Sequence, residues 1–204
     1  MDDVPPDVSG EDRPLPAGGF AAWSSGIQQV LRGGQDADVP CGGCTACCRS
    51  SQFVHIAPDE TDTLAVVPTE LQFPAPGLPG HVLLGYDERG HCPMLVDGGC
   101  SIYDNRPRTC RTYDCRIFPA TGVAPDADKP AIARQARRWR FDLGTDADRV
   151  EHEAVQAAAR FVNDRGDVVA DDERPGNATQ HAVLVLRTHA ERPPESGDRP
   201  TTQG

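Results

Sequence analysis

Eight cysteines confined to residues 41–115 of this 204-residue chain are the feature that most constrains its fold. Thiols at this density in a reducing compartment are typical of a metal site, because ordinary cytosolic thiols do not form disulfides. We therefore treat all eight as candidate metal ligands. They are Cys41, Cys44, Cys47, Cys48, Cys92, Cys100, Cys110 and Cys115.

The first cysteines follow a spacing that suits metal binding. Two cysteines separated by two residues can present their sulfurs to one ion from a single tight turn. Cys41, Cys44 and Cys47 overlap two such units, as in the first part of the bacterial iron–sulfur run, whose fourth ligand precedes a proline. Cys92 is followed by Pro93 and is the corresponding candidate here.

Cys48 directly follows Cys47, and adjacent side chains diverge, so the two are expected to bind different metals or different irons of one cluster. We expect two sets of four, although other divisions remain open. The expected sets are Cys41, Cys44, Cys47 and Cys92 in one, and Cys48, Cys100, Cys110 and Cys115 in the other.

The identity of the metal stays open. Thiolate-only sites suit both zinc and iron–sulfur clusters, and we favour an iron–sulfur cluster slightly. A disulfide framework is the third alternative and would require an oxidising compartment. His55 and His91 are the histidines nearest the cysteines, and whether either is a ligand is undecided.

Arginines accompany the cysteines in an otherwise acidic chain. They either offset thiolate charge or pair at the surface with Asp97, Asp104 and Asp114. The arginines concerned are Arg49, Arg106, Arg108, Arg111 and Arg116.

Composition narrows the class of protein. The net charge of −11 argues against a nucleic-acid partner. The N-terminus is acidic where a signal peptide is basic, and the chain has no apolar run of about 18 residues, so we expect a cytoplasmic protein with no membrane association. With 20 Gly and 19 Pro, the core is expected to be small and loop-rich.

The predicted fold is α+β, small and loop-rich, with a cysteine-ligated metal core, a short β-hairpin and several short helices. Apolar periodicity predicts a helix over 20–31, and a strand over 53–56. Residues 81–86 are expected to form a hairpin with 91–96. Asn105 is expected to cap a helical turn that carries Cys110 and ends before Pro119.

The last third of the chain is predicted to be mainly helical. Residues 131–141 carry one apolar face, and Thr145 with Asp148 resembles a capping box that starts the next helix. Residues 177–187 favour helix over strand.

We expect one domain over 13–187. Within it, 41–118 would form the cysteine core and 130–187 a helical extension. Residues 1–12 and 188–204 are expected to be disordered.

The cysteine pattern resembles the YkgJ-type cysteine-cluster family, a CxxCxxCC domain described as zinc- or iron-chelating. The resemblance covers about residues 41–118 and includes the Cys92-Pro93 pair and the run Arg106-Pro107-x-x-Cys110-Arg111-x-Tyr113-x-Cys115. It implies that all eight cysteines are ligands, and it implies no defined reaction.

Three hypotheses on function follow. The leading one is a metal-binding protein with one or two thiolate-ligated centres and no known process or protein partner. The second is a redox or group-transfer enzyme that uses the cluster, although the sequence shows no catalytic triad or cofactor loop. The third is a zinc-stabilised interaction module that binds through Arg137 and Arg138.

Overall fold

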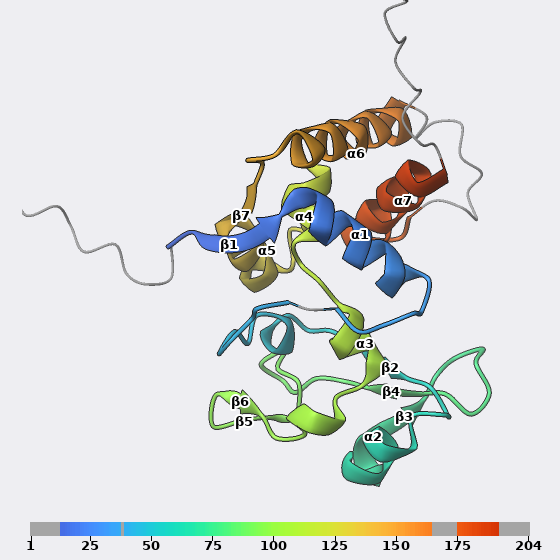
Figure 1. Cartoon of the computed structure of the whole chain (residues 1–204). Coiled ribbons are helices and arrows are strands. Elements are labelled where there is room, and N and C mark those ends of the chain that lie inside the picture. Colours follow the sequence, from blue (N-terminus) through green and yellow to red (C-terminus); the bar gives the residue numbers. More distant parts are fainter. Residues whose placement is uncertain (1–12, 38, 165–174, 192–204) are drawn as a thin grey trace, which may run out of the picture.

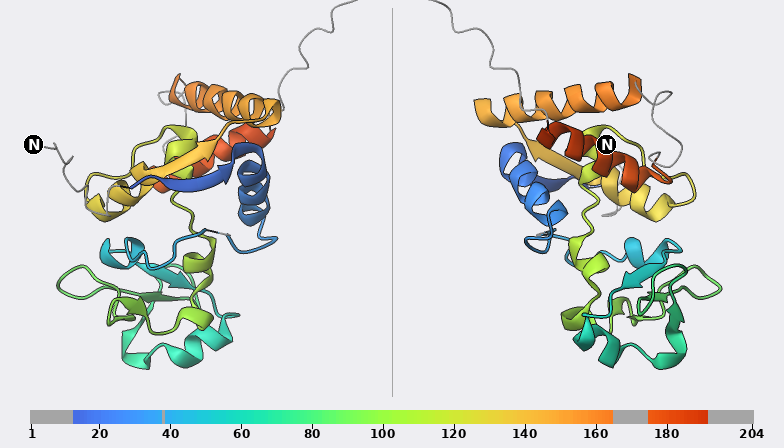
Figure 2. Two further views of the ribbon diagram at one scale, coloured as in Figure 1. Left: turned by 60° about the vertical axis from the view of Figure 1, so that its left-hand side comes forward. Right: turned by 90° about the vertical axis from the view of Figure 1, so that its right-hand side faces the viewer.

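The computed structural model describes residues 13–37, 39–164 and 175–191. Figure 1 shows an upper part built from the two ends of the described chain and a lower part formed by its middle. The same division is visible in both views of Figure 2. Two connections join the parts, one through residues 32–37 and 39–46 and the other through residues 113–116.

The upper part is mostly helical. Its only described sheet is a parallel pair in which Leu15 lies opposite Trp139 and Gly19 lies opposite Asp142. Its elements are β1 (Leu15–Gly19), α1 (Phe20–Leu31), α4 (Ile117–Thr121), α5 (Pro130–Arg138), β7 (Trp139–Asp142), α6 (Asp146–Asp164) and α7 (Ala178–Glu191).

The lower part consists of short elements. Its three-stranded antiparallel sheet has the order β2-β4-β3, and a separate hairpin joins β5 to β6. Asp97 and Gly98 form the hairpin turn with φ of 49° and 79°, values that a two-residue type I′ turn requires. The elements are η2 (Cys47–Arg49), β2 (Val54–Ile56), α2 (Thr61–Val66), η3 (Thr69–Leu71), β3 (Gln72–Pro74), β4 (Val82–Leu84), β5 (Leu95–Val96), β6 (Gly99–Cys100), η4 (Tyr103–Asn105) and α3 (Arg108–Thr112).

Each part has its own apolar core, and each core includes cysteine. In the upper core Phe20 meets Phe141 edge to face at 4.9 Å between ring centroids, and Cys115 is among the buried members. The lower core is smaller, and Cys92 packs against it. Its buried members are Val54, Ile56, Val67, Leu84 and Met94. Cys92 and Cys115 therefore belong to different parts of the molecule.

Several predictions are confirmed. The fold is small and α+β, α1 has the predicted limits, and residues 177–187 lie largely within helix α7. The capping box is also present, because the Asp148 N–H donates to Thr145 Oγ1 at 3.1 Å and the Thr145 hydroxyl donates to Asp148 Oδ2 at 2.6 Å. Local patterns were sufficient for these elements.

The predicted hairpin between 81–86 and 91–96 is wrong. Strand β4 pairs with β2 on one side and β3 on the other, so both of its edges are occupied. The reversal itself is correct, since Asp87 Oδ1 accepts from the N–H groups of Arg89 and His91. Beyond it the chain meets η2 instead, where the Cys92 N–H donates to the Cys48 carbonyl at 2.8 Å.

The helix predicted over 131–141 ends early, at Arg138, because Trp139 begins strand β7. Pro119 does not end a helix but lies in the first turn of α4, where its missing N–H is tolerated. Pro107, not Asn105, occupies the cap position of α3, and the Glu60 carboxylate accepts from the Arg108 N–H.

Residues 1–12 and 188–204 were expected to be disordered. Residues 1–12 and 192–204 lie outside the described residues, and α7 continues to Glu191. Among the helices that the structure describes, each is too short or too polar to span a bilayer.

Gly26, in the middle of α1, offers a test of the packing around this helix. A Cβ placed on Gly26 would meet no atom within 4 Å, and glycine inside a helix is about 0.5–1 kcal/mol less favourable than alanine. We expect Gly26→Ala to raise the free energy of unfolding by about that amount, measured by urea denaturation.

Gly122 is the matched control, because it ends α4 in the left-handed region with φ of 74°. Gly122→Ala is expected to lower the free energy of unfolding by about 1 kcal/mol or more. A destabilised Gly26→Ala variant would show that α1 packs more closely than described.

Candidate metal centre

All eight cysteines are free thiols, so the disulfide framework is not formed. Their exposure differs. Cys115 is buried, Cys41, Cys47 and Cys110 are exposed, and the other four are half-buried.

The backbone places the first four cysteines in one short stretch. The Cys44 N–H donates to the Cys41 carbonyl at 3.0 Å, which closes the turn between them. Cys47 and Cys48 begin η2, which lies against α5 of the upper part. This stretch therefore reaches both parts of the molecule.

The other four cysteines come from separate elements. Cys92 is bound through its N–H to the Cys48 carbonyl, and Cys100 lies on β6 opposite Leu95. Cys110 is in the middle of α3, which packs on β2. Cys115 follows α3, and its sulfur accepts a hydrogen bond of 3.2 Å from Trp139 Nε1.

Four thiols form a first group, defined here as Cys41, Cys44, Cys47 and Cys115. Burial and then the charge of Cys44 raise the pKa of Cys41 to about 11. Cys47 keeps an exposed surface, yet desolvation is the largest cause that raises its pKa, followed by the charges of Cys115, Cys44 and Cys41. Burial also raises the pKa of Cys115 to about 12, against the lowering effect of the Trp139 hydrogen bond.

A second group consists of Cys48, Cys92, Cys100 and Cys110. Burial and then the charges of Cys92 and Cys100 raise the pKa of Cys48 to about 11. Burial and then the charges of the other three raise the pKa of Cys110 to about 12. Burial raises the pKa of Cys92 as well, although the backbone N–H groups of Met94 and Leu95 donate to its sulfur and lower it.

This grouping corrects the expected division, because Cys92 and Cys115 exchange places. Cys92 is tied to Cys48 by its backbone and packs on the lower core, whereas Cys115 is enclosed in the upper core beside Trp139. The groups are neighbours, since the charge of Cys44 acts on the pKa of both Cys47 and Cys48.

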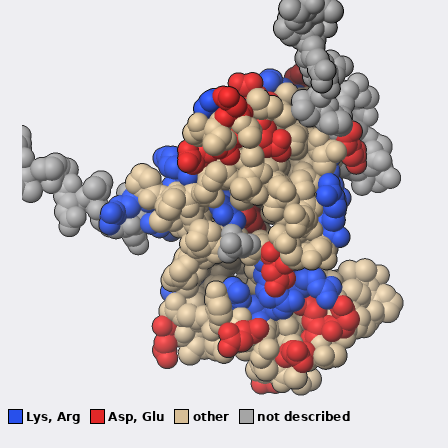
Figure 3. Space-filling model, viewed as in Figure 1, with Lys and Arg blue, Asp and Glu red and all other residues tan. Residues whose placement is uncertain are grey.

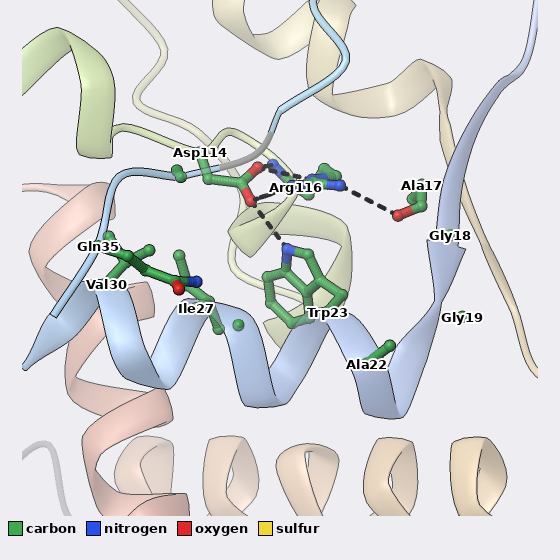
Figure 4. A pocket seen from close by; sticks show the side chains of 12 residues that line it. Ala17, Gly18, Gly19, Ala22, Trp23, Ile27, Val30, Gln35, Asp114 and Arg116 are labelled. Atoms are coloured by element: carbon green, nitrogen blue, oxygen red, sulfur yellow. Dashed lines mark hydrogen bonds and ion pairs between the residues drawn. The ribbon is translucent and has the colours of Figure 1, made fainter.

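A buried ion pair flanks Cys115. Asp114 and Arg116 are 3% and 8% exposed, and Arg116 Nε donates to Asp114 Oδ1 at 3.0 Å. Trp23 Nε1 donates to Asp114 Oδ2 at 2.9 Å, and Arg116 Nη1 donates to the Ala17 carbonyl at 3.2 Å (Figure 4). These contacts fix the residues on both sides of Cys115 to α1 and β1.

The same ion pair lines a cavity of about 340 Å³ under α1. Burial and the charge of Cys44 have the largest effects on the pKa of Cys41. The ion pair also affects it, because the charge of Asp114 raises this pKa and that of Arg116 lowers it. Pairing of Asp114 with an arginine at the surface was one of the two alternatives, and the structure places this pair in the interior.

The other arginines gather on the lower part around α3, beside acidic side chains (Figure 3). Arg108 bonds Asp59 at 2.7 Å and Arg111 bonds Asp36 at 3.0 Å, and these partners differ from Asp97 and Asp104, which the surface alternative named. The Arg106 guanidinium lies 3.7 Å from the Tyr103 ring centroid.

Neither candidate histidine, His55 or His91, forms a side-chain hydrogen bond with a cysteine among the described residues. His55 Nε2 is 2.8 Å from His81 Nδ1, and their rings stack at 4.8 Å. His91 is held through its backbone N–H by Asp87.

The hydroxyl of Tyr113 is a feature that the sequence reasoning missed. It is buried and has no hydrogen-bond partner among the described residues. Burial raises the pKa of Tyr113, and the charges of Cys47 and Cys115 raise it further. The only sequence signal for it was its place in the Cys110-Arg111-x-Tyr113-x-Cys115 run.

As the described side chains are placed, no three His, Cys, Asp or Glu residues converge closely enough to hold a metal ion. To bind a metal ion, the cysteine side chains of either group would have to turn so that their sulfurs face a common point. The expected cysteine-ligated core therefore remains a proposal, and so does the division of the thiols into two groups.

The raised thiol pKa values predict how the metal-free protein responds to pH. Unfolded thiols ionise near pH ~8.5, whereas folded Cys41 and Cys110 stay protonated to about 11 and about 12. Above pH ~8.5 the unfolded chain releases protons that the folded chain keeps, so the free energy of unfolding falls as pH rises toward the folded pKa values. Urea denaturation of the reduced, chelator-treated protein between about pH 7.5 and about pH 10.5 measures this.

Apart from the cysteines, few side chains titrate in that interval, because the chain has one lysine and three tyrosines. Cys110→Ala is the control and is expected to make the dependence on pH shallower. A free energy of unfolding that stays constant over the interval would contradict the burial of these thiols.

The ion pair beside Cys115 gives a further prediction. Arg116→Met leaves Asp114 buried without its cation, and we expect a loss of about 3–5 kcal/mol in the free energy of unfolding. Arg108→Met removes an exposed ion pair and is expected to change stability little. Urea denaturation of both variants compares them, and equal small effects would mean that the Asp114–Arg116 pair is open to water in solution.

The comparisons with known proteins agree with the cysteine pattern. Residues 40–132, a little under half of the chain, match the model of the CxxCxxCC family, described as "Putative zinc- or iron-chelating domain". Searches of curated proteins and of solved structures found no match. The matched segment contains all eight cysteines, so the resemblance to this family is confirmed for residues 40–132.

Proposed function

We propose that this protein binds metal through two neighbouring centres of four thiolates each. The observation that carries the proposal is the division of the eight thiols into two groups of four whose charges act on one another. The match to a zinc- or iron-chelating domain supports the same class of function.

The chemistry of the residues fits such centres. Four thiolates are a complete ligand set for zinc or for an iron–sulfur cluster. Sulfur atoms in both groups already accept N–H donors, Cys115 from Trp139 and Cys92 from the backbone of Met94 and Leu95. Donors of this kind stabilise metal-bound thiolates and orient them.

We favour an iron–sulfur cluster in the first group, because Cys41, Cys44 and Cys47 keep the C-x2-C-x2-C spacing. The second group suits either metal. A bound cluster supplies electron transfer, and bound zinc supplies folding free energy. Free thiolate ligands need a reducing environment, so we place the protein in the cytoplasm.

The two centres would have different structural effects. In the first group Cys115 comes from the upper core, whereas Cys41, Cys44 and Cys47 come from the stretch that leads into the lower part. Metal at this group would join the two parts. The second group lies within the lower part, where regular elements are short, so metal there would stabilise that part itself.

A second candidate function is protein interaction through α5. This helix buries Ile132 and Ala136, and within the described chain neither Arg134 nor Arg137 has an ion-pair partner. Because α5 contacts η2, an acidic partner bound there would lie beside the first group.

Metal analysis of anaerobically purified protein tests the proposal. We expect iron with sulfide, or zinc, in amounts that account for two centres, together with thiolate-to-metal absorption. Cys115→Ser and Cys100→Ser should each lose the metal of one group only, because each variant removes one of four ligands. Protein purified without iron or zinc would contradict the proposal.

Paired variants test the grouping. Cys41→Ser combined with Cys115→Ser should lose no more metal than either single change, because both ligands serve one centre. Cys41→Ser combined with Cys92→Ser should lose the metal of both. The reverse pattern would restore the division expected from the Cys-Pro spacing.

A further inference from the structure

The two tryptophans of the chain donate their indole N–H groups to consecutive residues of one connection. Trp23 Nε1, from α1, donates to Asp114 Oδ2 at 2.9 Å, and Trp139 Nε1, at the start of β7, donates to Cys115 Sγ at 3.2 Å. Both indoles are buried in the upper core, where an N–H donor without an acceptor would be unfavourable. The upper part therefore holds residues 114 and 115 by two directed contacts.

These contacts make Cys115 the fixed member of the first group. Cys115 is 5% exposed and Trp139 is 2% exposed. On the far side of the cysteine, Arg116 Nη1 donates to the Ala17 carbonyl on β1 at 3.2 Å (Figure 4). Turning the Cys115 sulfur away from Trp139 would leave a buried indole N–H without its acceptor. The sulfur is thus held where the upper part places it.

The other three cysteines of the first group lie on the turn that leads into the lower part. Cys41 and Cys47 are exposed, and Cys44 is half-buried. A Cβ on either glycine between the first two cysteines would meet no atom within 4 Å, so the turn has room to move. Because the sulfurs of the group must face a common point to bind a metal ion, the turn has to close on Cys115, and not the reverse.

We propose that Trp139 is a positioning residue of the first group, which fixes the sulfur of Cys115 so that the turn of residues 41–47 closes on it when metal binds. The inference rests on the proposed metal binding and adds to it the residue that selects the fourth ligand. Cys92, which the Cys-Pro spacing favoured, receives its donors from the backbone of the lower part instead. Cys115 can accept from Trp139 and bind metal together, because a thiolate sulfur has several lone pairs.

The test uses the full chain carrying Cys100→Ser, a background in which the proposed function confines cobalt(II) to the first group. Adding Trp139→Phe should raise the dissociation constant for cobalt(II), measured by competition with a chelator, by about tenfold or more, since removal of a partner behind a ligand costs about 10–100-fold in affinity. The sulfur-to-cobalt charge-transfer band should also move to longer wavelength, because an N–H donor lowers the energy of the sulfur lone pair.

Phe20→Leu is the matched control, because Phe20 is 0% exposed in the same core and its side chain has no polar atom to donate. In the metal-free protein it should lower the free energy of unfolding, as Trp139→Phe does. The cobalt affinity and the band position of the Cys100→Ser background should stay as they are. The comparison separates loss of the N–H donor from a general loss of packing.

A second measurement does not require Trp139→Phe to fold. Trp23→Phe in the same background leaves Trp139 as the single tryptophan of the chain. Cobalt(II) at the first group should quench the emission of Trp139 strongly, because the indole contacts a ligand sulfur. Zinc, which has no d–d transitions, should quench it little.

Three results would overturn the inference. They are a Trp139→Phe protein with unaltered cobalt affinity and absorption, equal changes of both in Phe20→Leu, and Trp139 emission that cobalt leaves unaltered. Failure of the Cys100→Ser background and of the unaltered chain to bind cobalt would instead contradict the proposed function.

Discussion

The burial of clustered thiols is the constraint on which this structure depends. Desolvation is the largest penalty on ionising them, and the charges of neighbouring sulfurs add to it. Without a compensating cation the thiols stay protonated, with pKa values of about 11 for Cys48 and about 12 for Cys115. Metal binding must release these protons, so affinity, folding and pH are linked in one equilibrium.

The surroundings of Cys115 connect that equilibrium to the rest of the fold. Its sulfur accepts from Trp139, and its sequence neighbours Asp114 and Arg116 form a buried ion pair that also holds Trp23 and Ala17. The upper part is thereby anchored to the first group through one short segment. The second group meets the upper part through η2, which carries Cys48 and lies against α5, whereas its other cysteines lie in the lower part.

Sequence patterns were sufficient where the determinants are local. The apolar spacing of α1 and the Thr145–Asp148 capping box specify helices without reference to the rest of the chain. The parallel pairing of β1 with β7 joins segments that are distant in sequence, and the Pro- and Gly-containing β1 carries no periodic signal. The Cys-Pro pair was misleading, because a ligand's immediate neighbour does not show which centre it serves. The packing of Cys92 and Cys115 in different cores supports the proposed grouping.

X-ray absorption at the metal edge of anaerobically purified protein tests the central claim most directly. The account predicts a first coordination shell of four sulfur atoms at roughly 2.3 Å, as thiolate-only sites have. A shell containing nitrogen or oxygen ligands, or the absence of bound iron and zinc, would contradict it.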